Sequence, residues 1–306
     1  MVYPVIKIFA RIALKIFCAD IKINNEGLLN TRGPLLITAN HPNSFFDAIL
    51  IGALFNYPVH FLARGDAFRK PWHRTLLNLL NMIPIYRLSE GKENLHLNKA
   101  TFDLSKKLLS ENGIVLIFIE GISEHEYGMR PFKKGAGRIA LDCHQSGIPL
   151  KVLPLGINYS DFRKVGVYVE MNIAEPLTTE YLFTEIDEAR NLLIFNDKIR
   201  NDLEPLVWKQ NNHLKHKSNY WLLPFAIPGW ILNVPLYFPI KNFVDAKTKG
   251  TIFYHAVLLG ILYFSYPVYV LLIFASLMLA GINTWLALSV FAVFPFTAYI
   301  AVQVKN

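Results

Sequence analysis

Short apolar runs alternate with amphipathic segments from about residue 21 to residue 218, and this alternation predicts an α/β domain over that range. The apolar runs are short enough for buried strands. The predicted strands cover Leu35–Ala39, Val59–Ala63, Ile83–Tyr86, Ile114–Ile119, Lys151–Asn158 and Gly166–Met171. The predicted helices cover Ser44–Phe55, Pro71–Leu80, Asn94–Ser110 and Gly135–Gln145, with a charged amphipathic helix within Thr184–Lys215.

The C-terminal part has a different pattern, because no Lys, Arg, Asp or Glu occurs between Thr251 and Val304. A membrane-spanning helix needs roughly 20 apolar residues, so the tract can hold two spans, at about Ile252–Met278 and Thr284–Val302. No polar face at helical spacing is visible, which disfavours ordinary core helices. We expect residues 251–306 to form a transmembrane hairpin, in which His255 is the one ionisable side chain of note.

Residues 219–250 connect these two parts and are apolar, aromatic and rich in proline. Proline removes a helical hydrogen bond and clashes with the preceding turn, and this segment contains Pro224, Pro228, Pro235 and Pro239. We therefore expect an interfacial or re-entrant connector rather than a regular spanning helix. Deleting the chain after Ile240 should then affect membrane retention more than the active-site residues.

Residues 1–20 have the pattern of an amphipathic helix. Lys7, Arg11 and Lys15 recur at every fourth position, so they lie on one stripe, and apolar side chains cover the rest. This pattern is typical of a helix in a membrane interface. The alternative is an ordinary amphipathic helix packed against the domain.

The net charge of +8 favours an anionic partner, either lipid headgroups or a phosphorylated ligand. No nucleic-acid-binding motif accompanies the charge, so a nucleic-acid partner is not expected.

Cys18 and Cys143 form neither a disulfide framework nor a metal set, which fits a reducing compartment. Lysines flank the predicted spans, at positions Lys241, Lys247, Lys249 and Lys305, and the turn between the spans is uncharged. This distribution predicts an integral membrane protein with its domain on the cytoplasmic face.

The first candidate site lies where a predicted strand meets a predicted helix. His41 follows the strand Leu35–Ala39, and Asp47 lies in the first turn of the helix. Sites in α/β proteins form at the carboxyl ends of strands. A carboxylate here could keep one imidazole nitrogen protonated and leave the other to accept a proton from a hydroxyl. The alternative is a capping box, in which the Ser44 side chain bonds the Asp47 amide and the carboxylate reaches back.

Three further blocks are expected to converge with the first on one cleft. Each places a polar or charged residue at the end of a short apolar run or directly after it. The blocks are Asn81–Arg87, then Phe118–Gly121 with the basic segment Arg130–Arg138, and finally the buried strand Val152–Ile157.

These blocks resemble the motifs of the glycerolipid acyltransferase family, which includes lysophosphatidic acid and glycerol-3-phosphate acyltransferases, and the resemblance covers roughly residues 21–176. The family's first block is Asn-His, four variable residues and Asp. Asn40, His41 and Asp47 match it, but five residues lie between His and Asp here. The family's second block is Gly-x-Ile-x-x-x-Arg, in which Ile83 and Arg87 match.

The third block of the family is Pro-Glu-Gly-Thr-Arg-Ser, and this chain retains only part of it. Glu120 and Gly121 match, whereas the proline, threonine and arginine are replaced. The pattern Phe-Lys-Lys-Gly-Ala-x-Arg-Ile-Ala that follows is retained, and its cations could supply the missing charge. These cations are Lys133, Lys134 and Arg138, and Arg130, shortly before the pattern, is a further candidate.

The resemblance implies a central mixed sheet flanked by helices and an acyl transfer from a thioester to a glycerol-phosphate hydroxyl. His41 would be the general base and Asp47 its orienting partner, with backbone amides near the helix start as donors to the oxyanion. Arg87 would bind the acceptor phosphate, and Asn40, Glu120 and Gly121 would shape the substrate site. The donor would be acyl-CoA or acyl carrier protein, with no metal or further cofactor.

Three alternatives stay open from the sequence. The acceptor is expected to be 1-acyl-sn-glycerol 3-phosphate, with glycerol 3-phosphate as the second candidate. A non-catalytic membrane scaffold would explain the imperfect blocks. A lipid hydrolase using His41 and Glu120 would release free fatty acid without an acceptor.

Overall fold

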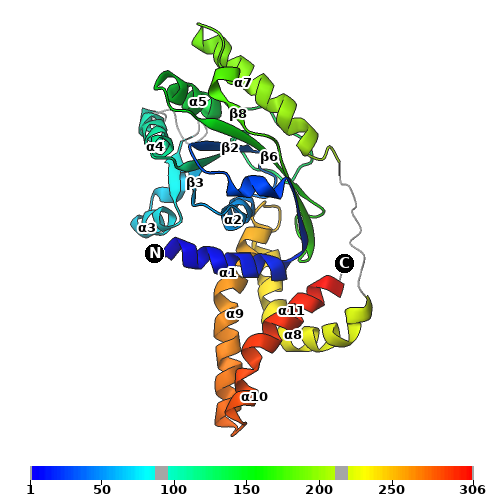
Figure 1. The fold of residues 1–306 in the computed structure, drawn as a ribbon. Coiled ribbons are helices and arrows are strands. Elements are labelled where there is room, and N and C mark those ends of the chain that lie inside the picture. The colour runs from blue at the N-terminus through cyan, green and yellow to red at the C-terminus, as the bar shows by residue number, and fades with distance from the viewer. Residues whose placement is uncertain (1, 87–95, 211–219, 305–306) are drawn as a thin grey trace.

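The computed structural model describes residues 2–86, 96–210 and 220–304. Figure 1 shows an α/β domain built on one twisted sheet and a set of long helices that extend away from it. The N-terminal helix lies between these two parts (Figure 1).

The sheet has eight strands in the order β1-β7-β6-β2-β5-β3-β4, and β8 pairs with β6 off this path. The strands are β1 (Cys18–Asn24), β2 (Leu35–Ala39), β3 (Val59–Arg64), β4 (Met82–Ile85), β5 (Ile114–Phe118), β6 (Lys151–Tyr159), β7 (Val167–Ile173) and β8 (Leu177–Thr178). β2 pairs in parallel with β5 and with β6, whereas β7 runs antiparallel to β6. The sheet is therefore mixed, as the family resemblance implied.

Helices cover both faces of the sheet and enclose two apolar cores. On one face α1 (Val2–Phe17) and α2 (Phe45–Leu54) contribute buried residues to the first core. On the other face α4 (Asn98–Ser110), α5 (Gly135–Gln145) and α7 (Glu188–Leu203) contribute to the second core. Two shorter helices, α3 (Pro71–Leu79) and α6 (Thr179–Leu182), complete the domain.

The predicted strands and helices of the domain are confirmed, with ends that differ by a few residues. The sequence pattern missed β1 and the short β8. β1 is an edge strand whose partner is β7, far along the chain, and it follows α1 without an intervening turn. The central strands were easier to predict because β2 and nearly all of β6 are buried, so they read as continuous apolar runs.

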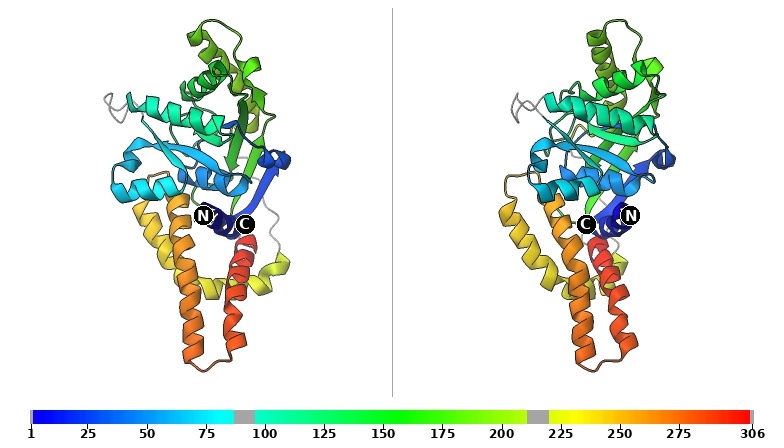
Figure 2. Two further views of the ribbon diagram at one scale, coloured as in Figure 1. Left: turned by 60° about the vertical axis from the view of Figure 1, so that its left-hand side comes forward. Right: turned by 90° about the vertical axis from the view of Figure 1, so that its left-hand side faces the viewer.

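Three helices in the C-terminal region are long and apolar enough to cross a membrane: Leu223–Lys247, Tyr254–Leu279 and Thr284–Val304. The last two fit the predicted hairpin and correspond to α9 (Tyr254–Leu279) and to α10 (Thr284–Leu288) with α11 (Val290–Val304). Figure 2 shows α9 and α11 side by side, extending away from the domain.

The proline-rich segment is helical, contrary to the expectation that its prolines disfavour a regular helix, whereas its interfacial or re-entrant placement stays a prediction. It forms one helix, α8 (Leu223–Lys247), which contains Pro228, Pro235 and Pro239. Packing against α11 outweighs the intrinsic cost of the prolines. At Gly229 the two helices approach so closely that a Cβ atom would lie 2.3 Å from the Thr297 carbonyl oxygen. Figure 2 shows the first part of α8 crossing the hairpin and its last part turning toward the domain.

The base of the hairpin belongs to the domain core. Val244, Tyr254 and Leu258 are fully buried in the same apolar cluster as Phe46 of α2. Deleting the chain after Ile240 would therefore remove part of that core as well as the apolar helices, and the expected larger effect on membrane retention stays a prediction.

Two of the three cations on the stripe of α1, Lys7 and Arg11, contact the domain, whereas Lys15 is exposed. Lys7 Nζ donates to the Asn56 carbonyl oxygen at 3.0 Å, and Arg11 donates to the carbonyl of Leu54 at 3.1 Å. These contacts satisfy carbonyl groups left free where α2 ends and place positive charge at the negative end of its dipole. The opposite stripe is apolar and exposed, and consists of Val5, Ile8, Phe9 and Ile12.

Candidate active site

His41 and Asp47 form a buried hydrogen-bonded pair. His41 follows β2 and Asp47 lies in the first turn of α2, and the distance from His41 Nδ1 to Asp47 Oδ2 is 2.9 Å. The Asp47 side chain is fully buried, whereas the His41 side chain is 13% exposed. A carboxylate only accepts hydrogen bonds, so Nδ1 carries the proton and Nε2 is left as the basic nitrogen.

Each carboxylate oxygen of Asp47 is held in place. Oδ2 also accepts the backbone N–H of Asn43 at 2.8 Å, and Oδ1 accepts the Tyr159 hydroxyl at 2.6 Å. Burial and the negative charge of Asp47 raise the pKa of Tyr159 well above its usual value, so this hydroxyl stays a donor. These bonds fix the carboxylate in the orientation that the imidazole needs.

Phe118 fixes the plane of the His41 ring. The two rings stack with centroids 3.7 Å apart and an interplanar angle of 8°. Phe118 ends β5 and pairs in register with Ala39 of β2, so the sheet itself brings the two residues together. The imidazole is thereby restrained by Asp47 at one edge and by an aromatic ring on one face.

The turn between His41 and Asp47, which holds the five intervening residues, contains one unusual backbone conformation, at Ser44. This residue has φ 53° and ψ −138°, a backbone conformation that non-glycine residues rarely adopt, just before α2 begins. Its N–H donates to Ser123 Oγ at 2.8 Å, which ties the turn to the third block. Backbone strain at a site is consistent with a functional constraint on this turn.

The capping-box alternative is wrong in its expected form. The Ser44 side chain makes no cap hydrogen bond, and the Asp47 carboxylate reaches back to the Asn43 amide instead of the Ser44 amide. Asp47 thus satisfies an amide before α2 while it orients His41.

The backbone amides expected to serve as oxyanion donors are largely committed within the protein. Asn43 N–H bonds Asp47, Ser44 N–H bonds Ser123, and the Phe46 N–H bonds the Asn43 carbonyl. The Asp47 N–H bonds the Ser44 carbonyl. These four groups therefore do not provide the proposed oxyanion hole.

Asn40 has a structural role that the sequence did not indicate. Its amide nitrogen donates to the Ile157 carbonyl at 2.9 Å, and its amide oxygen accepts the Ile157 N–H at 2.7 Å. This pair of bonds extends the β2–β6 contact beyond the paired strands. Because Asn40 is 2% exposed, its side chain anchors the chain just before His41, and its expected contact with substrate stays a prediction.

Glu120 is buried and lies two residues after the end of β5. Burial raises its pKa to about 7, with nearby Asp47 adding to the rise and Arg130 opposing it. Its Oε1 atom has no hydrogen-bond partner among the described residues. Arg130 forms ion pairs with Glu124 and Glu126, so its charge is largely used on the surface. Glu120 is thus a carboxyl group whose charge changes near neutral pH and whose free oxygen can accept or donate a bond.

Gly121 and Lys133 lie in direct contact. Gly121 has φ +71°, and a Cβ atom there would lie 2.8 Å from Lys133 Cγ. The Lys133 N–H also bonds the Ile119 carbonyl at 2.8 Å. The structure therefore brings Lys133 to the third block, as the sequence predicted.

The other predicted cations are less closely associated with the pair. Lys134 is exposed and directly precedes α5. Arg138 is exposed on α5 and lines a cavity of about 600 Å³ with residues of α4, none of which belongs to the first block. Arg87 lies outside the described residues, so its predicted phosphate contact stays a prediction. Within residues 2–86, 96–210 and 220–304, no group of three or more His, Cys, Asp or Glu side chains could hold a metal ion.

Sequence reasoning missed four residues that shape the site: Tyr159, Phe118, Ser123 and Asn43. Tyr159 lies four residues beyond Leu155, the partner of the last residue of β2, and just past the predicted strand Lys151–Asn158, so strand pairing alone did not indicate its contact with Asp47. The roles of the other three depend on side-chain directions in turns, which the sequence does not specify.

The two comparisons at the level of sequence agree with the motifs. A family model described as acyltransferase matches residues 20–158. The chain is 27% identical over 136 residues to the 1-acyl-sn-glycerol-3-phosphate acyltransferase of Bacillus subtilis (strain 168), a match that covers 43% of this chain and 63% of that protein. Its fold is also similar to the crystal structure of the 1-acyl-sn-glycerophosphate acyltransferase PlsC from Thermotoga maritima, with a TM-score of 0.45 and 19% identity over 65% of this chain and 79% of that one.

Proposed function

We propose that this protein transfers a fatty acyl group from an acyl thioester to a hydroxyl of a glycerol-phosphate acceptor, and the match of residues 20–158 to the acyltransferase family model supports the reaction class. The observation that carries this proposal is the buried His41–Asp47 pair, with a distance of 2.9 Å and Nε2 as the basic nitrogen. An assembled pair of this kind is not needed by a non-catalytic scaffold.

The reaction follows from the properties of the pair. His41 Nε2 takes the proton of the acceptor hydroxyl as its oxygen attacks the thioester carbonyl carbon. A carbon–oxygen bond forms, the carbon–sulfur bond breaks, and the imidazolium returns the proton to the departing thiolate. Imidazole suits both steps because its unperturbed pKa, about 6.5, lies near neutral pH. Asp47 holds the tautomer and stabilises the imidazolium.

We propose 1-acyl-sn-glycerol 3-phosphate as the acceptor, with glycerol 3-phosphate as the second candidate. The name of the Bacillus subtilis relative supports the first choice. Glu120 and Gly121 would border the acceptor, and Lys133 would contribute positive charge next to them. Arg87 is the proposed phosphate ligand, because a guanidinium can bind two phosphate oxygens at once. The donor would be acyl-CoA or acyl carrier protein, with no further cofactor.

We also propose that the site opens at the membrane surface on the cytoplasmic side. The exposed apolar stripe of α1 supports this placement, because Lys7 and Arg11 bond carbonyl groups of the domain and the apolar side is free to contact lipid. α3 has the same character: Trp72, Leu76 and Leu79 are exposed on one side and the helix has no buried residue.

The test is an assay of membranes that contain the protein, supplied with labelled acyl-CoA or labelled acyl carrier protein as donor and with each acceptor in parallel. Label in diacylglycerol phosphate only with 1-acyl-sn-glycerol 3-phosphate supports the proposal as stated. Product only with glycerol 3-phosphate supports the second acceptor. Free fatty acid without an acceptor identifies a hydrolase, and no product with acyl-CoA or acyl carrier protein supports a scaffold.

A further inference from the structure

His255, at the start of α9, lies fully buried against the catalytic turn. Its Nδ1 is 2.8 Å from the side-chain nitrogen of Asn43, which lies between His41 and Asp47. Its Nε2 is 3.2 Å from the carbonyl oxygen of Lys164, in the loop between β6 and β7. A carbonyl only accepts, so Nε2 donates there and Nδ1 accepts from the Asn43 amide.

Asn43 connects this histidine to the pair. Its side chain is held by His255, and its backbone N–H donates to Asp47 Oδ2, the same oxygen that accepts from His41. Asn43 is fully buried, and its position sets where that N–H points. A change at His255 can therefore reach the carboxylate through one residue.

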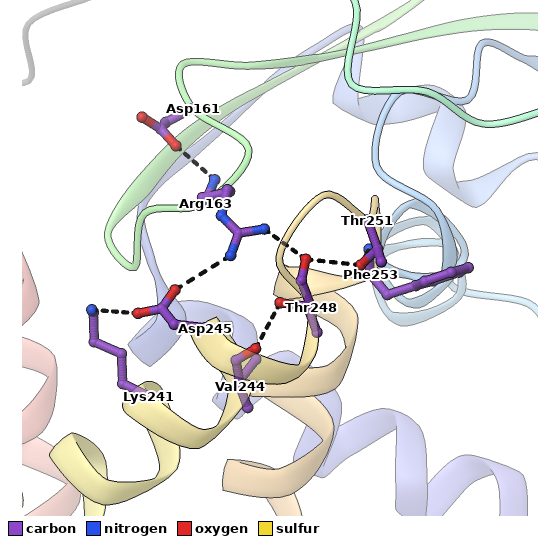
Figure 3. A network of polar contacts seen from close by, with 8 residues as sticks. All are labelled: Asp161, Arg163, Lys241, Val244, Asp245, Thr248, Thr251 and Phe253. Carbon is purple, nitrogen blue, oxygen red and sulfur yellow. Dashed lines mark hydrogen bonds and ion pairs between the residues drawn. The ribbon is translucent and has the colours of Figure 1, made fainter.

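The loop that holds the other side of His255 is itself tied to the start of the membrane helices (Figure 3). Arg163 donates to the Thr248 carbonyl at 3.0 Å and pairs with Asp245 at 3.4 Å, and Asp245 also pairs with Lys241 at 2.7 Å. The Arg163 guanidinium lies 4.6 Å from the centre of the Tyr254 ring. The junction of α8 and α9 is thus docked on the domain beside the catalytic turn.

We infer that His255 is a positioning residue for the His41–Asp47 pair and that the base of the membrane hairpin is part of the active-site scaffold. This inference rests on the proposed acyl transfer for its kinetic readout. The first turn of α9 then has a role in turnover in addition to its role in membrane anchoring.

Two substitutions separate the two hydrogen bonds of His255. His255→Asn keeps an acceptor near the position of Nδ1, so the bond to Asn43 can persist while the bond to Lys164 is lost. His255→Gln keeps a donor near the position of Nε2, so the bond to Lys164 can persist while the bond to Asn43 is lost. His255→Phe keeps a ring among Phe17 and Phe46 and removes both bonds. Tyr263→Phe is the control, because it removes a hydrogen bond between α9 and α1 remote from Asn43.

Acyl transfer is measured in membranes for the full-length protein and the four variants, with Tm as the measure of folding. We expect kcat to fall roughly tenfold or more in His255→Gln and His255→Phe, with KM within about twofold, since small displacements of a catalytic group are costly. His255→Asn should recover most of the turnover, and Tyr263→Phe should match the wild type. Equal losses of kcat in His255→Asn and His255→Gln, or an unchanged kcat in His255→Phe, would overturn the inference.

A second readout does not depend on turnover. The protein is labelled with 15N-histidine, and the NMR signal that disappears in His41→Ala is assigned to His41. This signal reports which ring nitrogen carries the proton. We expect a single Nδ1–H tautomer in the wild type and a mixture in His255→Phe. If the wild type transfers no acyl group, the proposed function fails while this experiment still decides the positioning role. An unchanged single tautomer in His255→Phe contradicts it.

Discussion

The Tyr159 hydroxyl donates a 2.6 Å hydrogen bond to Asp47 Oδ1, the carboxylate oxygen that His41 does not use. Both side chains are almost completely buried, so the bond is shielded from water. It links the end of β6 to the first turn of α2 and keeps the carboxylate from rotating away from the imidazole.

Tyr159→Phe should therefore reduce both stability and turnover. A buried carboxylate oxygen loses its partner, which should cost about 1–3 kcal/mol of unfolding free energy, and kcat should fall roughly tenfold as Asp47 gains freedom. Denaturant unfolding in detergent and the acyl-transfer assay measure the two effects. Tyr168→Phe is the control, because its hydroxyl makes only a 3.5 Å contact with Glu170. Equal effects in both variants would argue against a special role for Tyr159.

Gly121→Ala tests the contact between Gly121 and Lys133. The left-handed φ of +71° should cost about 1–2 kcal/mol with any side chain, and the added Cβ should also displace Lys133. We expect KM for the phosphate acceptor to rise severalfold. Gly147→Ala is a matched control, since Gly147 has φ +70° and open space around its Cβ position. A similar rise in KM in the control would show that backbone strain alone is responsible.

The raised pKa of Glu120 predicts a pH-dependent contribution to stability. The folded protein binds this proton more tightly than the unfolded chain, so the contribution is fully present below about pH 4.5 and is lost as pH rises through about 7. Glutamine does not ionise, so Glu120→Gln should not lose this stability as the pH rises. Its free energy of unfolding should exceed that of the wild type between pH 5 and 8, by up to about 3 kcal/mol. Unfolding at several pH values measures this, with the exposed Glu111→Gln as control. If the difference in free energy of unfolding between Glu120→Gln and the wild type does not grow with pH, the raised pKa of Glu120 is contradicted.

The placement of α1 predicts which of its positions contact lipid. A spin label at Phe9→Cys should be accessible to oxygen and protected from a water-soluble nickel reagent, because this position lies on the exposed apolar stripe. The label at Lys107→Cys, on exposed α4, should show the reverse accessibility. Cys18 and Cys143 are buried and should label poorly. Water exposure at both positions would exclude an interfacial α1.

Much of the fold could be predicted because its elements have strong local patterns. β2 and α5 have the predicted ends, and α9 differs from the predicted span by about two residues at its start. α8 was mispredicted because proline content is a local signal, whereas close packing at Gly229 is a tertiary contact. β1 was missed because its pairing with β7 joins distant parts of the chain.

The candidate site was predictable only to the level of motif residues. His41 and Asp47 were found from their place between a strand and a helix, and the structure brings them together. The conformation of Ser44 was not predictable, because non-glycine residues rarely have a positive φ. His255 was noticed as an isolated ionisable residue, but its contact with Asn43 spans 212 positions of the chain.

The most direct test of the account is the acyl-transfer rate of His41→Ala in membranes. Nε2 of His41 is the proposed base, so kcat should fall roughly 10²- to 10⁴-fold, while the amount of protein retained in the membrane fraction stays unchanged. Turnover near the wild-type level in a folded, membrane-retained His41→Ala protein would contradict the assignment of the base.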